Sequence, residues 1–486
     1  MGHPLFRKKS ISRIIDDAQA RDTDVHSHGL KKVLGVRDLT FLGIAAVVGA
    51  GIFSTIGNAA FNGGPGISLL FIITAVTCGF SALCYAEFAS MIPIAGSAYT
   101  YSYTTMGEFI AWIIGWDLVL EYALGAATVS IAWSEYLNKL LNYLGMHIPY
   151  EWCHSPFEHS LDGVYGIMNV PALLILILLS LLLIRGTQES AFVNNVIVVT
   201  KVAIVVLFIV FGWQFINPAN HTPYIPPAST FTDHMGVPHH YGGILGILGA
   251  AGVVFFAFIG FDAVSTAAQE AKNPGRDMPK GILGSLLICT ILYILFAHVL
   301  TGVASVDDFR TQGREASVTY AIQTYMHGYD WLAKLVTVAI LAGFSSVILV
   351  MLLGQSRVFY SMSRDGLLPK VFSELHPVYR TPYKSNLILF VFVGLFAAFV
   401  PGDIVGDMTS IGTLFAFMLV AAGVIIMRKT NPDAKRTFRT PLVPLVPILG
   451  IIVCGAMIFG LGWPNWSRLL MWLAIGFVIY FGYSAK

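Results

Sequence analysis

Charged side chains are scarce in this chain of 486 residues, of which Asp, Glu, Lys and Arg make up only 12%. An average soluble domain carries about 25% charged residues. Apolar residues account for 56% of the sequence, and the mean hydropathy is +0.72. The composition therefore excludes an ordinary soluble protein and indicates an integral membrane protein. The formal net charge, +2, is too close to zero to indicate nucleic acid as a partner.

Cysteines and catalytic motifs are also few. Only Cys153 of the five cysteines falls in a loop, so a disulfide framework is excluded. The sequence has no metal motif such as HExxH, no phosphate-binding loop and no recognisable nucleophile–base pair. We therefore expect neither an enzyme nor a bound cofactor or metal.

Long apolar runs dominate what is present. Segments of about 20 apolar residues are long enough to cross a bilayer as helices. Twelve such segments fall at roughly 39–61, 66–91, 107–138, 167–185, 191–215, 243–270, 279–304, 330–360, 385–401, 405–428, 441–462 and 465–484. The sequence thus predicts an all-α membrane protein with twelve transmembrane helices, the third and eighth of them longer than a bilayer requires.

The basic residues predict the orientation. With the N-terminus placed inside, 23 of the 29 Lys and Arg residues lie on the inner side and five on the outer side, and Lys201 alone lies within a helix. This asymmetry predicts that both termini are cytoplasmic. The first 38 residues are polar and basic and lack the apolar core of a signal peptide. Their stretch FRKKSISRIIDD suits a short helix on the anionic inner leaflet, or equally a frayed tail.

Two of the apolar segments are interrupted near their middle. The first contains VVGAGIF (47–53), in which Gly49 and Gly51 flank one alanine, and glycine is a weak helix former. The sixth contains VFFAFIGFDAVS (254–265), in which Gly260 and Asp262 interrupt the helical pattern. Each interruption falls in the first helix of a block of five, and an odd number of helices per block inverts the second block. Glycine-interrupted helices in matching places of two inverted halves indicate the binding site of a secondary transporter.

This pattern predicts a division of the chain into five parts. They are a cytoplasmic N-terminal segment (1–38), a first inverted repeat (39–215), an extracellular loop (216–242), a second inverted repeat (243–428), and a cytoplasmic loop with two further helices (429–486). The extracellular loop holds four histidines, His221, His234, His239 and His240. Metal binding is one interpretation, but their spacing fits no standard zinc site, so a solvated loop is favoured.

An interrupted helix exposes backbone groups at mid-membrane, which is tolerable where they face a cavity or a ligand. N–H groups near Gly51 and Ile52 suit a carboxylate, and carbonyls near Val47 and at 256, 257 and 259 suit an ammonium. An α-amino acid carries both groups on one carbon. The substrate-binding residues predicted on this basis are Val47, Gly49, Ala50, Gly51, Ile52, Phe256, Ala257, Ile259 and, from the eighth helix, Met351. The alternative is that the glycines serve only close helix packing.

Three ionisable residues within the membrane are candidates for proton coupling. Lys201 lies ten residues into the fifth helix, where a lysine costs about 3 kcal/mol by insertion scales. It either gains and loses a proton during transport or acts as a fixed internal cation. Asp262 either caps the inner half of the sixth helix or relays protons. Glu121, one turn after Asp117, either neutralises a cation or binds a ligand amine.

The motifs resemble those of the amino acid–polyamine–organocation superfamily, in particular its bacterial branch related to cationic amino acid transporters. The resemblance covers roughly residues 30–484. The motifs that carry it include LGVRDLTFLGIAAVVGAGIF, ALCYAEFASMIPIAGSAYTYSY, GEFIAWIIGWDLVLEY, FFAFIGFDAVSTAAQEAKNPGRDMPKGI and SRDGLLPKVF.

This resemblance implies the LeuT-type fold, with a five-plus-five inverted repeat, unwound first and sixth helices and two extra C-terminal helices. It implies that Lys201 takes the place of a bound sodium ion, with Ser345 and Ser346 as the neighbouring cation-site hydroxyls. Relatives often have a hydroxyl residue where this chain has Ala50, so carboxylate binding is expected from backbone N–H groups. The family carries both cationic and small neutral amino acids, and Phe256, Ile259 and Met351 favour a neutral apolar substrate.

The leading hypothesis is a proton-coupled amino acid importer that works by alternating access. An exchanger, an uncoupled carrier and an amino acid sensor remain open as alternatives. A channel is disfavoured because no repeated ring of polar residues is evident. The expected partners are an amino acid, protons and membrane lipid, and the sequence identifies neither an oligomeric state nor a small accessory subunit.

Overall fold

The computed structural model describes residues 7–9, 32–53, 56–92, 94, 96–160, 163–232, 238–311, 317–460 and 463–484. Most of the predicted N-terminal segment, including residues 10–17 of FRKKSISRIIDD, lies outside the described residues, and so does His234. The described chain is helical apart from one small hairpin.

Seven helical segments within the described residues are long and apolar enough to cross a membrane. They are Ala59–Met91, Glu108–Asn142, Ala191–Phe215, Pro274–Val303, Asp330–Arg364, Ile404–Thr430 and Trp463–Ser484. Three shorter apolar helices cover Val170–Arg185, Tyr383–Phe399 and Leu445–Phe459. The predicted lengths of the third and eighth helices agree with the two segments of 35 residues.

Within the described residues, the first half of the chain contributes ten helical elements to the bundle. They are α2 (Val36–Val47), α3 (Ala50–Phe53), α4 (Ile56–Gly63), α5 (Ile67–Met91), α6 (Ala98–Thr105), α7 (Glu108–Val119), the π-helical η3 (Leu120–Leu124), α8 (Gly125–Tyr143), α9 (Val170–Arg185) and α10 (Thr187–Gly212). Short 3₁₀ turns connect several of them: η2 (Gly64–Gly66), η4 (Tyr150–Trp152), η5 (Trp213–Phe215) and η6 (Pro218–His221).

The second half follows a similar course. Its elements are α11 (Gly243–Gly249), α12 (Ala251–Phe256), the 3₁₀ helix η7 (Phe261–Glu270), α13 (Pro274–Val303), α14 (Val306–Thr311), α15 (Ser317–Tyr325), α16 (Asp330–Arg364), the 3₁₀ turn η8 (Lys370–Ser373), α17 (Tyr383–Phe399) and α18 (Gly402–Thr430). The C-terminal part adds α19 (Leu445–Gly460), α20 (Trp463–Ile479) and the π-helical η9 (Tyr480–Ser484).

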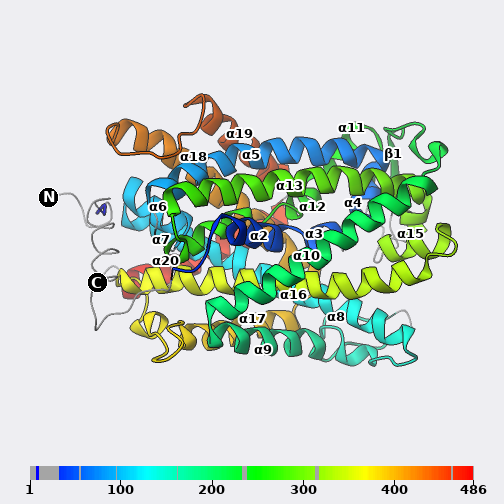
Figure 1. The fold of residues 1–486 in the computed structure, drawn as a ribbon, viewed down its shortest axis with the longest axis horizontal. Helices are drawn as coiled ribbons and strands as arrows, with labels where there is room; N and C mark the ends of the chain where they lie inside the picture. Colours follow the sequence, from blue (N-terminus) through cyan, green and yellow to red (C-terminus); the bar gives the residue numbers. More distant parts are fainter. Residues whose placement is uncertain are drawn as a thin grey trace.

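The short broken elements lie in the middle of the bundle, with long helices around them (Figure 1). Helix α13 packs on α5 and α2, α16 packs on α8 and α10, and α18 packs on α19. The outer helices have one face against this core and one apolar face directed away from it. On α5, for example, Phe71 and Cys78 are buried, whereas Ile73 and Val76 are exposed. An exposed apolar stripe of this kind suits contact with lipid.

Both predicted interruptions coincide with helix ends. Helix α2 ends at Val47 and α3 begins at Ala50, and the intervening Val48 has extended backbone angles. Helix α12 ends at Phe256, Gly260 adopts a left-handed φ of +112°, and η7 continues as a 3₁₀ helix. Only glycine takes such a φ readily, so Gly260 is required by the backbone at this turn.

The loop over 216–242 differs from the all-α expectation. Its strands β1 (Ser229–Thr232) and β2 (Pro238–Tyr241) pair antiparallel. The hairpin is anchored to the bundle by a hydrogen bond from the Gly242 N–H to the Asn62 carbonyl, 3.0 Å.

The two described ends of the chain meet at one end of the bundle. The Glu108 N–H donates to the Arg7 carbonyl at 3.1 Å, and Lys9 forms an ion pair with Asp365. The Ser484 hydroxyl donates to the Leu367 carbonyl at 2.7 Å. Residues 7–9 and Ser484 therefore lie on the same side, next to the end of α16.

Candidate functional site

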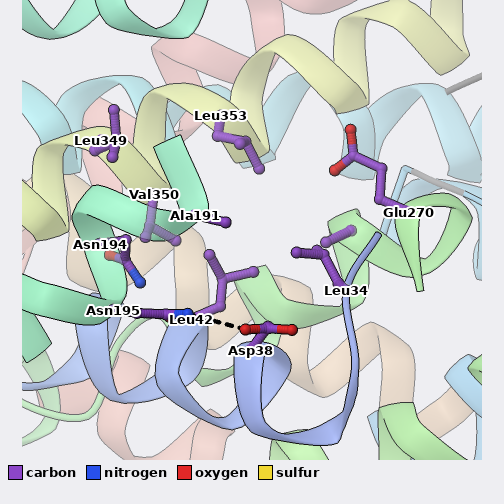
Figure 2. A pocket seen from close by; sticks show the side chains of 11 residues that line it. Leu34, Asp38, Leu42, Ala191, Asn194, Asn195, Glu270, Leu349, Val350 and Leu353 are labelled. Atoms are coloured by element: carbon purple, nitrogen blue, oxygen red, sulfur yellow. Dashed lines mark hydrogen bonds between the residues drawn. The ribbon is translucent and has the colours of Figure 1, made fainter. Parts of the chain in front are cut away.

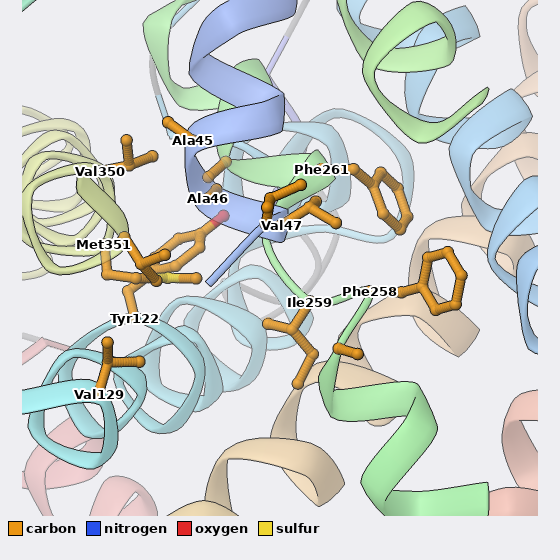
Figure 3. Close-up of a cluster of buried hydrophobic side chains, with 14 of the residues drawn as sticks. Ala45, Ala46, Val47, Tyr122, Val129, Phe258, Ile259, Phe261, Val350 and Met351 are labelled. Atoms are coloured by element: carbon orange, nitrogen blue, oxygen red, sulfur yellow. The ribbon is translucent and has the colours of Figure 1, made fainter. Parts of the chain in front are cut away.

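A cavity of about 280 Å³ lies between the two interrupted helices. The predicted residues among its lining are Val47, Gly51, Phe256, Ile259 and Met351. The lining also includes Ala46, Gly125, Val129, Val347 and Thr409, which the sequence did not single out. Figure 3 shows Met351, Val129 and Ile259 around the gap between α2 and the turn before η7. The lining holds no charged side chain, so it suits an apolar group.

The glycines of the first interruption have a packing role. A Cβ on Gly51 would lie 2.1 Å from the Ala257 Cα, and a Cβ on Gly49 would lie 2.2 Å from Val347 Cγ2. Gly51 therefore lets the two interrupted segments touch, and Gly49 lets α16 approach the first one. The packing interpretation holds for both glycines, and Gly51 in addition borders the cavity.

Carbonyl groups at the first interruption accept hydrogen bonds from distant side chains. The Tyr293 hydroxyl of α13 donates to the Val47 carbonyl at 2.6 Å. The Lys201 ammonium of α10 donates to the carbonyls of Ala45 at 2.9 Å and Val48 at 2.5 Å. The predicted Ile52 N–H donor is bonded locally, to the Gly49 carbonyl at 3.2 Å.

Lys201 is fully buried, with 0% exposure. Besides the two carbonyls, its ammonium donates to the Ser346 hydroxyl of α16 at 2.9 Å. Three oxygen acceptors thus surround the nitrogen, and they belong to two helices other than its own. Ser345 lies elsewhere: it is half-buried, and its hydroxyl donates to the Leu341 carbonyl of its own helix at 2.8 Å. Of the two predicted hydroxyls, the structure brings only Ser346 to Lys201.

Three carboxyl groups are buried in the bundle, on α7, on the π-helical turn η3 and on η7. Asp117, Glu121 and Asp262 each have 0% exposure. The Tyr122 hydroxyl donates to Asp262 Oδ2 at 2.6 Å, and the Glu121 carboxyl lies close to that of Asp262. Asp262 is in the first turn of η7. The two predicted acidic candidates therefore meet, and neither lines the central cavity.

Glu121 and Tyr122 lie on a π-helical turn inside a long helix. Such turns are rare and frequently occur at functional sites. The turn shifts the direction of the side chains that follow it, so the α-helical period of the sequence misplaces them. No glycine or proline marks this turn within LEYAL (120–124), so the π-helical turn could not be predicted from the residues there.

Two of the predicted residues add little to the geometry. The Ala257 backbone forms the turn against Gly51, and Ile52 is buried in the core. The side chain of Ala50 lies outside the described residues.

Buried ion pairs lie at the end of the bundle that carries residues 7–9. Glu270 binds Arg357 at 2.8 Å, with side-chain exposures of 1% and 3%. Glu87 accepts from Arg428 at 2.8 Å and from Arg436 at 3.1 Å. Both carboxylates are therefore buried and paired with arginines.

Within the described part of the chain, no group of three or more metal-ligating side chains is found. His221 packs on His298, with ring centroids 4.5 Å apart. Burial and the neighbouring His298 lower the pKa of His221. The side chains of His239 and His240 lie outside the described residues.

Comparison with known proteins shows which family this chain is similar to. The profile of the amino acid permease family matches residues 34–481. The branched-chain amino acid permease of Bacillus subtilis (strain 168) is 42% identical over 482 residues, which cover 99% of this chain and 98% of that protein.

Two further relatives are named after other substrates. The methylthioribose transporter of Bacillus subtilis (strain 168) is 38% identical over 483 residues, 99% of this chain and 98% of that protein. The chloroplastic cationic amino acid transporter 9 of Arabidopsis thaliana is 35% identical over 464 residues, 94% of this chain and 77% of that protein. These relatives are permeases and transporters, not enzymes.

Proposed function

This chain belongs to the amino acid permease family, and we propose that it is a secondary transporter that imports neutral apolar L-amino acids together with protons. The observation that carries the substrate class is the uncharged central cavity, which lies between the two interrupted helices and is lined by Val47, Val129, Phe256, Ile259 and Met351. A branched aliphatic side chain fits such a lining, in keeping with the name of the branched-chain amino acid permease.

The fold that we propose has twelve transmembrane helices in a LeuT-type arrangement. Residues 39–215 and 243–428 form two inverted repeats of five helices, and residues 429–486 add a loop and two helices. The interruptions in the first element of each repeat support this division. Residues 1–38 and the C-terminus lie in the cytoplasm, and residues 216–242 lie outside. The contacts of residues 7–9 and 484 with one end of the bundle support a common side for both termini.

Alternating access fits the way in which the interrupted helices are held. Their short halves can rotate about the turns at Val48 and Gly260 while the long helices stay in place. The buried Lys201 ammonium supports the proton coupling, since it bridges the first interruption to α10 and α16. When protonated, it donates to both carbonyls and stabilises one arrangement of α2. When neutral, it donates less strongly, and the inner half of the first helix is released.

Cationic substrates are disfavoured by the position of the acidic residues. A lysine or arginine side chain needs a carboxylate within reach, and Glu121 and Asp262 do not line the cavity. We therefore place the cationic class second, even though several relatives are named cationic amino acid transporters.

Uptake into liposomes of defined internal pH tests the proposal. The panel is labelled leucine, isoleucine, valine, alanine, arginine and methylthioribose. We expect accumulation of the branched apolar amino acids when the outside is more acidic, and no accumulation without the gradient. Uptake that requires internal amino acid indicates an exchanger, and equilibration that ignores pH indicates an uncoupled carrier. Binding without uptake indicates a sensor.

A further inference from the structure

A second cavity, of about 380 Å³, lies between α2, α10, η7 and α16 (Figure 2). Its lining includes Asp38 and Leu42 of α2, Asn194 of α10, Glu270 of η7, and Val350 and Leu353 of α16. It is separate from the central cavity, with which it shares no lining residue. It faces the end of the bundle that carries the buried Glu270–Arg357 pair.

The position of this cavity relative to Lys201 follows from helix geometry. On α10, Asn194 precedes Lys201 by seven residues, which is two turns or about 10.5 Å along the same face. On α16, Leu353 follows Ser346 by seven residues, and on α2, Asp38 precedes Ala45 by seven. Ala45 and Ser346 are the residues that bind the Lys201 ammonium. All three helices therefore place the cavity two turns from the ammonium. The helix faces between the cavity and the ammonium are called the groove below, and Val198 of α10 closes it in this structure.

The polar atoms of this cavity are mostly acceptors. Asp38 Oδ1 accepts from the Asn195 side chain at 2.9 Å, as the dashed line in Figure 2 shows. Asn194 is 2% exposed, and its Oδ1 has no hydrogen-bond partner among the described residues. A buried acceptor without a donor is costly, so a donor molecule of small size is expected beside it. Water is the simplest one, because Asp38, Asn194, Asn195 and Glu270 give it polar partners within an otherwise apolar lining.

Among the described residues, the charged groups around the two ends of the groove leave the Asp38 carboxylate without a cationic partner. Lys201 is faced by carbonyls of α2, by Ser346 of α16 and by Cys289 of α13. Near Asp38, Glu270 is paired with Arg357, and the Arg37 guanidinium lies over the Phe41 ring. Asp38 is bonded to Asn195 and to the Gly35 N–H, both uncharged donors.

We propose that this cavity is the route by which the proton leaves Lys201 for the cytoplasm, with Asp38 as the acceptor. The inference rests on the proton coupling proposed above. An N–H bond of the Lys201 ammonium breaks, the proton passes along water molecules in the groove, and an O–H bond forms on Asp38. Lysine becomes neutral and the carboxylate becomes a carboxylic acid. Asp38 then gives the proton to bulk water and recovers its charge.

A buried apolar side chain closes the route in this structure. Val198 lies between Asn194 and Lys201 on the same face of α10 and is 1% exposed. Water must pass Val198 before a proton can be relayed, so release requires α2 or α10 to move. A route that opens only in one state is what coupling needs, because a permanent water file would let protons leak.

The test uses the full-length Asp38→Asn variant in liposomes. Asparagine keeps the size and the acceptor that caps α2 at Gly35, but cannot take up the proton. We expect the initial rate of pH-driven uptake to fall at least about a hundredfold, the lower end of the range that a positioned proton acceptor contributes. Counterflow exchange at equal pH needs no proton release and should stay within about twofold of wild type. Asp433→Asn, an exposed acid in the loop after α18, is the matched control and should leave both rates unchanged.

A second variant separates proton transfer from a structural defect. Asp38→Asn combined with Asn194→Asp moves the carboxylate to the neighbouring helix of the same cavity, and we expect it to restore pH-driven uptake. If Asp38→Asn keeps the wild-type rate of pH-driven uptake, the route is wrong while the proposed symport stands. If Asp38→Asn loses both activities and Asn194→Asp fails to restore them, the route is likewise overturned. If wild-type protein shows no pH-driven accumulation, the proposed function itself fails.

Discussion

The two helix interruptions are built in different ways. The first is held from outside: side chains of α8, α10 and α13 bind the carbonyls of Phe53, Val48 and Val47. The backbone of the second is held from within, since successive N–H groups over 257–259 bond three residues back, at 3.2, 2.9 and 3.2 Å, and Gly260 supplies the left-handed turn. The Tyr122 hydroxyl binds it from outside at the side chain of Asp262 and not at a backbone carbonyl. The first interruption can therefore respond to the protonation of a partner, whereas the second depends on glycine geometry. We therefore expect the first interruption to respond to the protonation of Lys201 and the second to act as a hinge at Gly260.

We expect the largest effect on transport from a substitution at the contact between the two interruptions. In Gly51→Leu the new side chain would meet the Ala257 backbone, with Cβ only 2.1 Å from its Cα. Backbone cannot move aside as a flexible side chain does, so we expect transport to be lost and the melting temperature to fall. Uptake and thermal unfolding in detergent measure both effects. The control is Gly79→Leu on α5, where nothing lies within 4 Å of the Cβ position. Wild-type uptake by Gly51→Leu would contradict the close packing of the two segments.

Removal of Lys201, the charged partner of the first interruption, should have the next largest effect on transport. Lys201→Met removes the ammonium donor of the Ala45 and Val48 carbonyls. The Ala45 carbonyl keeps a hydrogen bond from the Ser346 hydroxyl at 3.4 Å, whereas the Val48 carbonyl loses its donor, and a buried acceptor without a donor costs about 1–3 kcal/mol. We expect pH-driven accumulation to disappear and the protein to be destabilised. Parallel assays of pH-driven uptake and counterflow separate coupling from folding. A Lys201→Met carrier that still concentrates substrate on a proton gradient would remove Lys201 from the coupling.

The same contrast explains how much the sequence could predict. Glycine marks both interruptions, and the depth of Lys201 marks it as special, so their positions were predictable. The partners were not, because Tyr293 and Ser346 lie 246 and 145 residues from the groups that they bind. A single sequence carries no sign of such pairings. Two elements were not predicted for local reasons. The π-helical turn at Glu121 has no glycine or proline to mark it, and the hairpin of β1 and β2 lies within a proline-rich loop.

The second interruption should respond to a change in glycine geometry alone. Gly260→Ala forces a side chain into a φ of +112°, at a cost of about 1–3 kcal/mol, and its Cβ would lie 2.6 Å from the Ala46 Cβ. Gly328→Ala is the matched control, since it has a φ of +88° with nothing within 4 Å. We expect the melting temperature to fall further for Gly260→Ala than for Gly328→Ala, and uptake to fall only in the former. If the two variants have equal effects on melting temperature and uptake, Gly260 contributes only its backbone conformation and does not act as a hinge.

The smallest expected effect separates two neighbouring hydroxyls on α16. Ser346→Ala removes one of the three oxygen acceptors of the Lys201 ammonium, at 2.9 Å, and leaves the two carbonyls in place. Losing one hydrogen bond to a charged group costs about 1.5–3 kcal/mol, so proton binding should weaken and the pH at which uptake is half-maximal should shift to lower values. Ser345→Ala removes only a bond within its own helix and should leave the pH profile unchanged. Uptake measured over a series of external pH values compares the two variants directly. Because the substitutions are chemically identical and one residue apart, a shift in Ser345→Ala but not in Ser346→Ala would show that the lysine is held differently from this arrangement.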